Sequence, residues 1–300
     1  MGRGGFEARE SHMKRASPVI AMLVLLSACT APGNRIREFR DRVSTGERKM
    51  QHGDAPGAVR AFELALDLEP ESASTWFSLG QARREAGDES GAAEAFSRAI
   101  ELNLDDATVW FRRGKAKQAA GDPAGAVADH TKALSIRTAA EFYRARGHSR
   151  FCLGDLEGAI ADLAEAGSTQ KAGSNLDFTQ LELAAARLRA NRRDEAIEGL
   201  KRHFRQNRPT METAWPRQIA EFLQGDFPES ELLLTARTGD EKTRKERTCE
   251  ASFYAGVARE AAGDDAGAIE RFRDCVGSSV TGFVEPDMAR AELKRLGAGN

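Results

Sequence analysis

The chain has 300 residues, of which 30% are charged and 41% are hydrophobic, and its formal net charge at pH 7 is −2. This composition excludes a disordered chain and a protein built from membrane-spanning helices. The nearly balanced charge argues against nucleic acid as a partner, because phosphate binding needs a concentrated basic surface. The four cysteines form no CxxC pair and no zinc spacing with histidine, so the sequence predicts no metal site and no cofactor.

The first elements in chain order are those of a targeting signal. Lys14 and Arg15 precede an apolar run over residues 19–26, which is much shorter than the roughly 20 residues of a spanning helix. The run ends in Leu-Ser-Ala-Cys at residues 26–29, which resembles the lipobox of bacterial lipoproteins. The resemblance implies that residues 1–28 are a signal peptide and that Cys29 carries the lipid that anchors the mature chain. The alternative is an ordinary cleaved signal followed by a chance cysteine.

Two further features of this end bear on processing and destination. Met13 is a better start than Met1, so residues 1–12 are left out of the fold. Thr30, and not aspartate, follows the lipobox cysteine. In bacteria with two membranes, the resemblance then implies an outer-membrane lipoprotein that faces the periplasm. Residues 29–38 are expected to form a short acylated linker.

A glycine–aspartate motif with an alanine four residues after the aspartate organises the rest of the chain. Its copies begin at Gly53, Gly87, Gly121 and Gly154, at intervals of 34, 34 and 33 residues, with later copies at Asn191 and Gly263. Glycine suits the left-handed end of one helix, and aspartate suits the N-terminus of the next. The motif therefore predicts a series of paired helices.

The residues around each motif resemble the tetratricopeptide repeat (TPR) family. An aromatic residue and a leucine–glycine pair precede it, as in Trp76, Leu79 and Gly80, and alanines flank a large residue after it, as around Phe62. The resemblance spans roughly residues 39–282. It implies an all-α TPR helix-turn-helix solenoid, a right-handed superhelix of closely packed helix pairs. The expected repeats are residues 39–72, 73–106, 107–139, 140–173, 177–210 and 249–282.

The period breaks before the last repeat. Within residues 211–248 we expect short helices at 215–224 and 229–236, followed by a charged, solvated connection at 240–247. This block is either a degenerate repeat or a functional insertion, and the sequence leaves both open. Residues 283–300 are expected to form a capping helix (286–296) and a tail, which would cover the exposed end of the stack.

Some departures from the family pattern predict internal contacts. The family has a tyrosine late in the first helix, where this chain has Lys117 and Arg150 in two repeats. Asp129 and Asp162 fall on the second helices where they could pair with these bases, so we expect ion pairs within the repeats. His130 takes the position held by Phe62 and Phe96 in other repeats, which predicts a packed interior histidine.

The resemblance also implies where a partner binds. TPR arrays bind peptides or protein segments in a concave groove lined by the first helix of each repeat. The matching positions combine aromatic and basic side chains, which suits a segment that carries carboxylates. The alternative is a solvated helix face. The expected groove residues are Phe77, Arg84, Phe111, Arg112, Lys115, Arg144, His148 and Phe151.

No catalytic motif occurs in the sequence, so we expect a binding protein and not an enzyme. The leading hypothesis is a membrane-tethered scaffold of the bacterial cell envelope that gathers cell-wall enzymes or assembly factors. The alternatives are a pilotin for secretin or pilus assembly and an envelope hydrolase. Whether the chain forms a homo-oligomer is left open.

The last expectation concerns Cys249 and Cys275. They lie at the start of one helix and near the end of its antiparallel partner in the last repeat, so the two thiols should be neighbours. An oxidising periplasm would permit a disulfide between them. The alternative is two small buried thiols.

Overall fold

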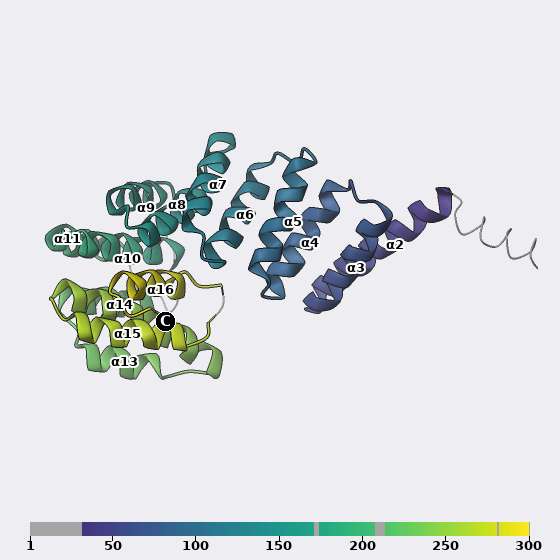
Figure 1. The fold of residues 1–300 in the computed structure, drawn as a ribbon. Helices are drawn as coiled ribbons and strands as arrows, with labels where there is room; N and C mark the ends of the chain where they lie inside the picture. The colour runs from purple at the N-terminus through teal and green to yellow at the C-terminus, as the bar shows by residue number, and fades with distance from the viewer. Residues whose placement is uncertain (1–31, 171–173, 208–213, 281, 300) are drawn as a thin grey trace, which may run out of the picture.

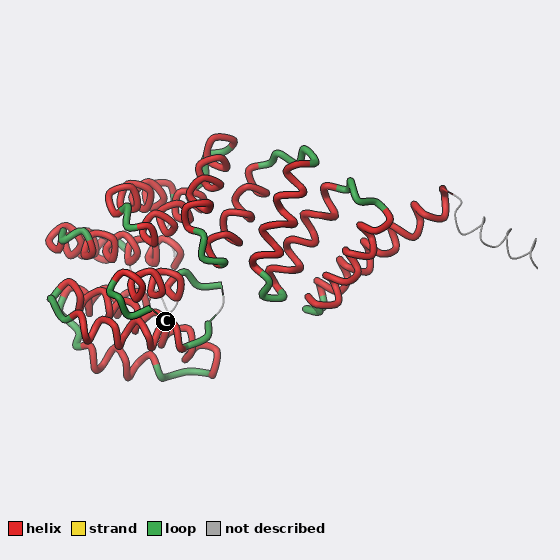
Figure 2. The backbone as a smooth tube through the Cα atoms, in the orientation of Figure 1, coloured by secondary structure: helices red, strands yellow, loops and turns green. Residues whose placement is uncertain are grey.

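The computed structural model describes residues 32–170, 174–207, 214–280 and 282–299. Within these ranges the chain consists of helices and their connecting loops, without strands (Figure 2). The predicted signal peptide and Cys29 lie outside the described residues. None of the helices in the described ranges has the length and apolar character needed to cross a membrane.

The helices pack as consecutive antiparallel pairs, which confirms the predicted all-α helix-turn-helix solenoid (Figure 1). Each second helix also packs against the first helix of the next pair, so that neighbouring pairs stack side by side. The pairs are α2 (Pro32–Gln51) with α3 (Ala55–Leu68), α4 (Ala73–Glu85) with α5 (Glu89–Glu101), α6 (Ala107–Ala119) with α7 (Pro123–Ile136), α8 (Ala140–Leu153) with α9 (Leu156–Thr169), α10 (Ser174–Arg189) with α11 (Arg193–Gln206), α12 (Ala214–Gln224) with α13 (Glu229–Ala236), and α14 (Glu241–Ala261) with α15 (Asp265–Gly277), followed by α16 (Glu285–Arg295).

The repeated glycine–aspartate motif makes the turns as predicted. Gly53 has a φ of 74°, in the left-handed region that ends the preceding helix. Asp54 then caps α3, because its Oδ1 accepts a hydrogen bond of 2.9 Å from the backbone N–H of Gly57. A Cβ on Gly57 would lie 2.1 Å from the capping carboxylate, so this glycine is required by space. The same cap recurs at Asp88, Asp122, Asp155 and Asp264.

In four helix pairs a glycine on the first helix faces a ring on the second. A Cβ on Gly80 would come within 2.7 Å of the Phe96 ring, so α4 and α5 can pack this closely only with glycine there. Gly114 faces His130 in the same way. His130 is 1% exposed, which confirms the predicted interior histidine. Burial lowers its pKa to about 3, so the ring is neutral.

Two helices begin earlier than the sequence indicates. Helix α2 begins at Pro32, so residues 33–38 are helical and not part of a linker. Helix α14 begins at Glu241 and not at Cys249, so the charged segment 240–247 is mostly helix and not a connection. Much of this part of the helix is exposed, so it carries many charged residues and its sequence resembles that of a solvated loop.

The block at residues 211–248 continues the stack. Its two predicted short helices are α12 and α13. Helix α12 packs against α10 and α11, and α13 packs against α14. The block therefore occupies the place of a helix pair in the stack.

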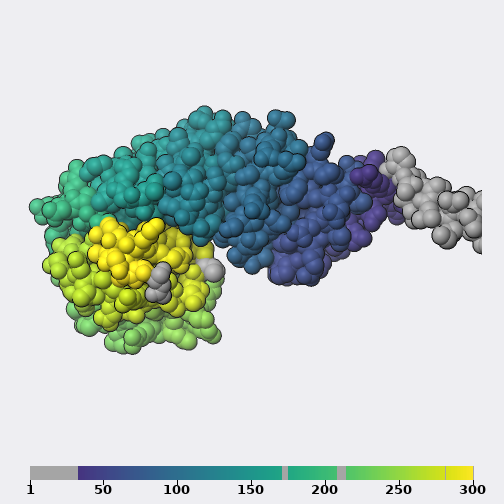
Figure 3. Space-filling model, in the orientation of Figure 1, coloured from purple at the N-terminus to yellow at the C-terminus, as the bar shows by residue number. Residues whose placement is uncertain are grey.

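The last helix does more than cap the end of the array. Helix α16 packs on α15 and α14, and it also contacts α8 in the fourth repeat (Figure 1). Arg189 on α10 reinforces this closure, because its Nε lies 2.7 Å from Glu292 on α16 and its Nη1 lies 3.4 Å from Glu260 on α14. Figure 3 shows the yellow C-terminal residues pressed against the teal middle of the chain, whereas the blue and purple N-terminal repeats extend away.

Candidate functional site

Because the array bends back on itself, its concave face is partly enclosed. A cavity of about 800 Å³, which we name the chamber, lies between α6 and α8 on one side and α12, α14 and residues 282–285 on the other. A second cavity of about 490 Å³, which we name the cleft, lies beside it. Lys115, His148 and residues 282–284 line both cavities, so the C-terminal segment crosses the concave face between them.

Six of the eight predicted groove residues line these cavities. Phe111, Arg112, Lys115, Arg144 and His148 line the chamber. Arg84, together with Lys115 and His148, lines the cleft. The concave surface expected from the sequence is therefore assembled from α4, α6 and α8.

The other two predicted groove residues lie elsewhere. Phe77 lines neither cavity, and its ring packs 5.6 Å from that of Phe96. Phe151 is 1% exposed and its ring lies 6.4 Å from that of Phe253 in the core. Phe151 is thus removed from the groove, because the closure of the array buries the face of α8 on which it lies.

Arg144 and His148 are held by a carboxylate that the sequence did not identify. Glu182 on α10 is fully buried; its Oε1 and Oε2 lie 2.5 and 2.8 Å from Nη2 and Nε of Arg144. Nε2 of His148 lies 2.7 Å from the same carboxylate. Burial opposes the charge on Glu182, but the attraction of Arg144 and His148 prevails and lowers its pKa to about 2. The charge of Arg144 is therefore neutralised within the protein and is not available to a partner.

Three other cations of the concave face have no such partner. Within the described residues, no carboxylate oxygen lies within 4.0 Å of a side-chain nitrogen of Arg84, Arg112 or Lys115. The Nε atoms of both arginines are buried without a hydrogen-bond partner. Burial lowers the pKa of Lys115, and the charges of Arg84, Arg112 and Arg144 lower it further. This arrangement concentrates unpaired positive charge where an anionic group could bind.

The remaining lysine and arginine side chains of α6 and α8 are structural. Lys117 Nζ lies 3.0 Å from Asp129, and Arg150 Nη1 lies 2.7 Å from Asp162, which confirms the ion pairs predicted within the repeats. Arg113 and Arg146 add a second base to each aspartate, at 2.6 and 2.7 Å. Both aspartates are buried.

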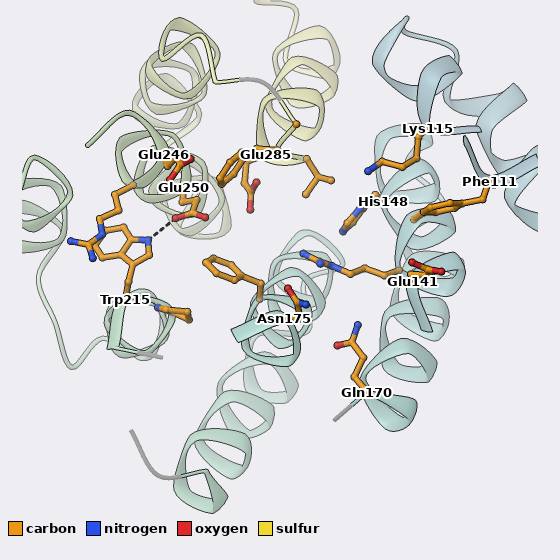
Figure 4. Close-up of a pocket in the computed structure, with 18 of the residues that line it drawn as sticks. Phe111, Lys115, Glu141, His148, Gln170, Asn175, Trp215, Glu246, Glu250 and Glu285 are labelled. Carbon is orange, nitrogen blue, oxygen red and sulfur yellow. Dashed lines mark hydrogen bonds between the residues drawn. The ribbon is translucent and has the colours of Figure 1, made fainter. Parts of the chain in front are cut away.

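The opposite wall of the chamber is acidic. Glu250 and Glu285 are 5% and 3% exposed, and the Trp215 Nε1 donates a hydrogen bond of 2.6 Å to Glu250 (Figure 4). Burial and the charge of Glu182 raise the pKa of Glu285 to about 7. Sequence reasoning missed these residues because Trp215 and Glu285 lie outside the expected repeats and Glu250 lies at the very start of the last one. A signal did exist for Glu182, which is the single charge in the run Leu-Glu-Leu-Ala-Ala-Ala of residues 181–186.

The cysteine pair lies apart from the cavities. The Sγ atoms of Cys249 and Cys275 are 3.0 Å apart and both side chains are buried, so the last helix pair brings the two thiols together. Whether they form a disulfide stays a prediction. Burial raises the pKa of Cys152 to about 12, so this thiol is poorly nucleophilic. Among the described residues, no cluster of three or more His, Cys, Asp or Glu side chains is arranged to hold a metal ion.

The helix pairs, their glycine turns and the concave groove define the class: an α-helical repeat solenoid. The model of the tetratricopeptide repeat family matches residues 73–106. Solved structures of tetratricopeptide repeat proteins share the fold of the chain, so its helix pairs form a TPR superhelix. No curated relative matches the sequence.

Three solved structures illustrate the likeness of fold. A tetratricopeptide repeat protein from Parabacteroides merdae is 14% identical with a TM-score of 0.58, over 86% of this chain and 99% of that one. MamA is 19% identical with a TM-score of 0.52, over 64% of this chain and 96% of its own. PilW, a type IV pilus biogenesis factor, is 16% identical with a TM-score of 0.50, over 80% of this chain and 92% of its own.

Proposed function

We propose that this protein is a membrane-tethered scaffold of the bacterial cell envelope that binds a carboxylate-bearing segment of a partner protein on its concave face. The observation that supports this most is the set of three unpaired cations, Arg84, Arg112 and Lys115. Most of the other basic side chains on the first helices form ion pairs with carboxylates. Three unpaired cations close together on the inner surface therefore lower the stability of the fold. A bound carboxylate would offset that cost.

The chemistry of these side chains favours a peptide segment with acidic groups. Arginine binds carboxylate through two parallel hydrogen bonds, and both arginines have an Nε without a partner. Phe111 lies beside them, with Lys115 Nζ 5.9 Å from its ring centre, and offers an apolar contact. The site thus combines charge and an aromatic surface, as peptide-binding grooves do.

The tether rests on the lipobox at residues 26–29. Only residues 30 and 31 separate Cys29 from the start of α2, so an acylated chain would hold the first repeat close to the bilayer. With Thr30 after the cysteine, the proposed location is the outer membrane, facing the periplasm. There the scaffold would gather cell-wall enzymes or assembly factors.

A role in pilus or secretin assembly is the second candidate. The likeness to PilW favours it, since PilW is a pilus biogenesis factor with the same fold. At 16% identity this likeness concerns the fold alone, so the pilotin role ranks second. An envelope hydrolase is the least supported alternative, because no catalytic motif occurs in the sequence.

Affinity capture from solubilised membranes tests the proposal. The wild-type chain is compared with the double variant Arg112→Glu, Lys115→Glu and with Arg202→Glu, which reverses an exposed charge on α11 outside the groove. We expect the double variant to lose the captured partner and the control to keep it. Cell-wall enzymes among the captured proteins would favour the scaffold, and a secretin or pilus component the pilotin role. Equal capture by all three chains would contradict a site in the groove.

A further inference from the structure

The chamber differs from an open TPR groove because basic side chains line one wall and buried carboxyl groups line the other. Figure 4 shows Lys115 and His148, together with Glu141, on one side and Glu246, Glu250 and Glu285 on the other. The basic wall belongs to α6 and α8, and the acidic wall belongs to α14 and the start of α16. The two walls meet only because the C-terminal end of the array turns back onto its middle.

The buried carboxyl groups of the acidic wall have no paired cation. Arg247 also lines the chamber, but its guanidinium lies over the Trp215 ring, 5.2 Å from the ring centre. Glu250 and Glu285 are both buried, and no ion pair between described residues includes either of them. Burial raises the pKa of Glu250, and the charge of Glu285 raises it further, so the two carboxyl groups are close enough to repel each other. Two buried carboxyl groups of this kind are relieved by a proton or by a bound cation.

The cations of the basic wall that face the chamber have no paired anion. Glu141 also lines this wall, but its carboxylate lies 3.8 Å from Arg137. Arg144 is neutralised by Glu182, but Arg112 and Lys115 are not paired, and the Arg112 Nε is buried without an acceptor. A ligand that carried only negative charge would also face Glu250 and Glu285. A ligand that carried only positive charge would face Arg112 and Lys115. A ligand with both charges satisfies both walls.

The rest of the lining suits a peptide backbone between the two charges. The amide side chains of Gln170 and Asn175 can donate and accept hydrogen bonds, and Trp215 supplies apolar surface (Figure 4). Phe178 adds to the apolar lining. A volume of about 800 Å³ lies within the usual range of sites for small ligands.

We infer that the chamber binds a short free peptide, with its terminal ammonium group at Glu250 and Glu285 and its terminal carboxylate at Arg112 and Lys115. This peptide site and the proposed partner-binding groove both use Arg112 and Lys115. Only the peptide site also uses the acidic wall. The two glutamates are therefore the residues that distinguish this inference from the proposed function.

Calorimetric titration of the full chain in detergent tests the inference, with trialanine as the probe. Free trialanine should bind, and N-acetyl-trialanine and trialanine amide should each bind about tenfold more weakly or worse, because each lacks one charge. Equal binding of the free and blocked forms, or no binding of free trialanine at millimolar concentration, overturns the inference. So does stronger binding of the doubly blocked peptide Ac-Lys-Ala-Asp-NH2, which would assign the chamber to charged side chains of a protein segment.

The double variant Glu250→Gln, Glu285→Gln supplies the matched control. Glutamine resembles the protonated carboxyl group, so this variant should fold, and it should bind free trialanine about tenfold more weakly. It should still capture the protein partner of the groove. Undiminished trialanine binding by this variant contradicts the assignment of the acidic wall. Loss of partner capture by Arg112→Glu, Lys115→Glu is a separate outcome and tests the proposed function alone.

Discussion

Removing Arg144 should destabilise the protein strongly, whereas removing the nearby Lys115 should not. The matched substitutions are Arg144→Met and Lys115→Met, which replace a charge by an apolar side chain of similar length. Arg144 makes two contacts of 2.5 and 2.8 Å with the buried carboxylate of Glu182. Its loss would leave Glu182 ionised, fully buried and contacted only by His148.

Loss of one partner of a buried ion pair costs about 3 to 5 kcal/mol. In a chain of this size that corresponds to a fall in melting temperature of roughly 5 to 9 °C. Lys115 has no paired carboxylate, and burial together with three like charges lowers its pKa. Its removal therefore relieves an unfavourable charge, and we expect a change within about 0.5 kcal/mol or a gain in stability.

Thermal and urea unfolding followed by circular dichroism would measure both variants. The double variant Arg144→Met, Glu182→Gln, measured with both single variants, completes a double-mutant cycle. Its loss of unfolding free energy should be clearly smaller than the sum of the losses in the two single variants. Comparable losses of stability in Arg144→Met and Lys115→Met would refute the reasoning, because they would show that both cations stabilise the fold equally. Strict additivity of the stability changes in the double-mutant cycle would also refute it.

Three further predictions concern other parts of the chain. Cys29→Ala should abolish fatty-acid labelling and leave an unprocessed precursor, and continued labelling of the variant would contradict the lipobox assignment. Thiol counting in denaturant without reductant should find one reactive group in the acylated chain, Cys152, if Cys249 and Cys275 form a disulfide worth roughly 3.5 kcal/mol in the chain-entropy model; three groups would exclude the bond. Since folding raises the pKa of Glu285 from 4.5 to about 7, this residue contributes folding stability at low pH, and that stability should be lost as the pH rises from about 4.5 to 7. In unfolding experiments, Glu285→Gln should remove roughly 3 kcal/mol of that pH dependence. An unchanged pH profile in the variant would contradict the burial of a titrating carboxyl group.

Features within one repeat were predictable from the sequence. The cap of Asp54 on Gly57 and the pair of Lys117 with Asp129 join residues of one helix pair, and the repeat period places such residues reliably. His130 was predictable for the same reason, because two other repeats have phenylalanine at its position.

The contacts of the candidate site were not predictable in this way. Glu182 reaches Arg144 from the next repeat, and Glu285 reaches the chamber from the far end of the array. These contacts depend on how far the superhelix turns, which is the sum of small rotations between repeats. No local pattern in the sequence predicts that sum. The early start of α14 was missed for a different reason, since its first turns carry charges typical of a loop.

The contact of α16 with α8 has a consequence for how such an array can change in length. In an open solenoid a repeat can be added or lost anywhere, because each unit contacts only its neighbours. Here the last helix must meet the fourth repeat, so adding a helix pair between them would carry α16 past α8 and open the chamber. The number of units from α8 to α16 is therefore constrained, whereas the first helix pair, α2 with α3, lines neither cavity and is free to vary.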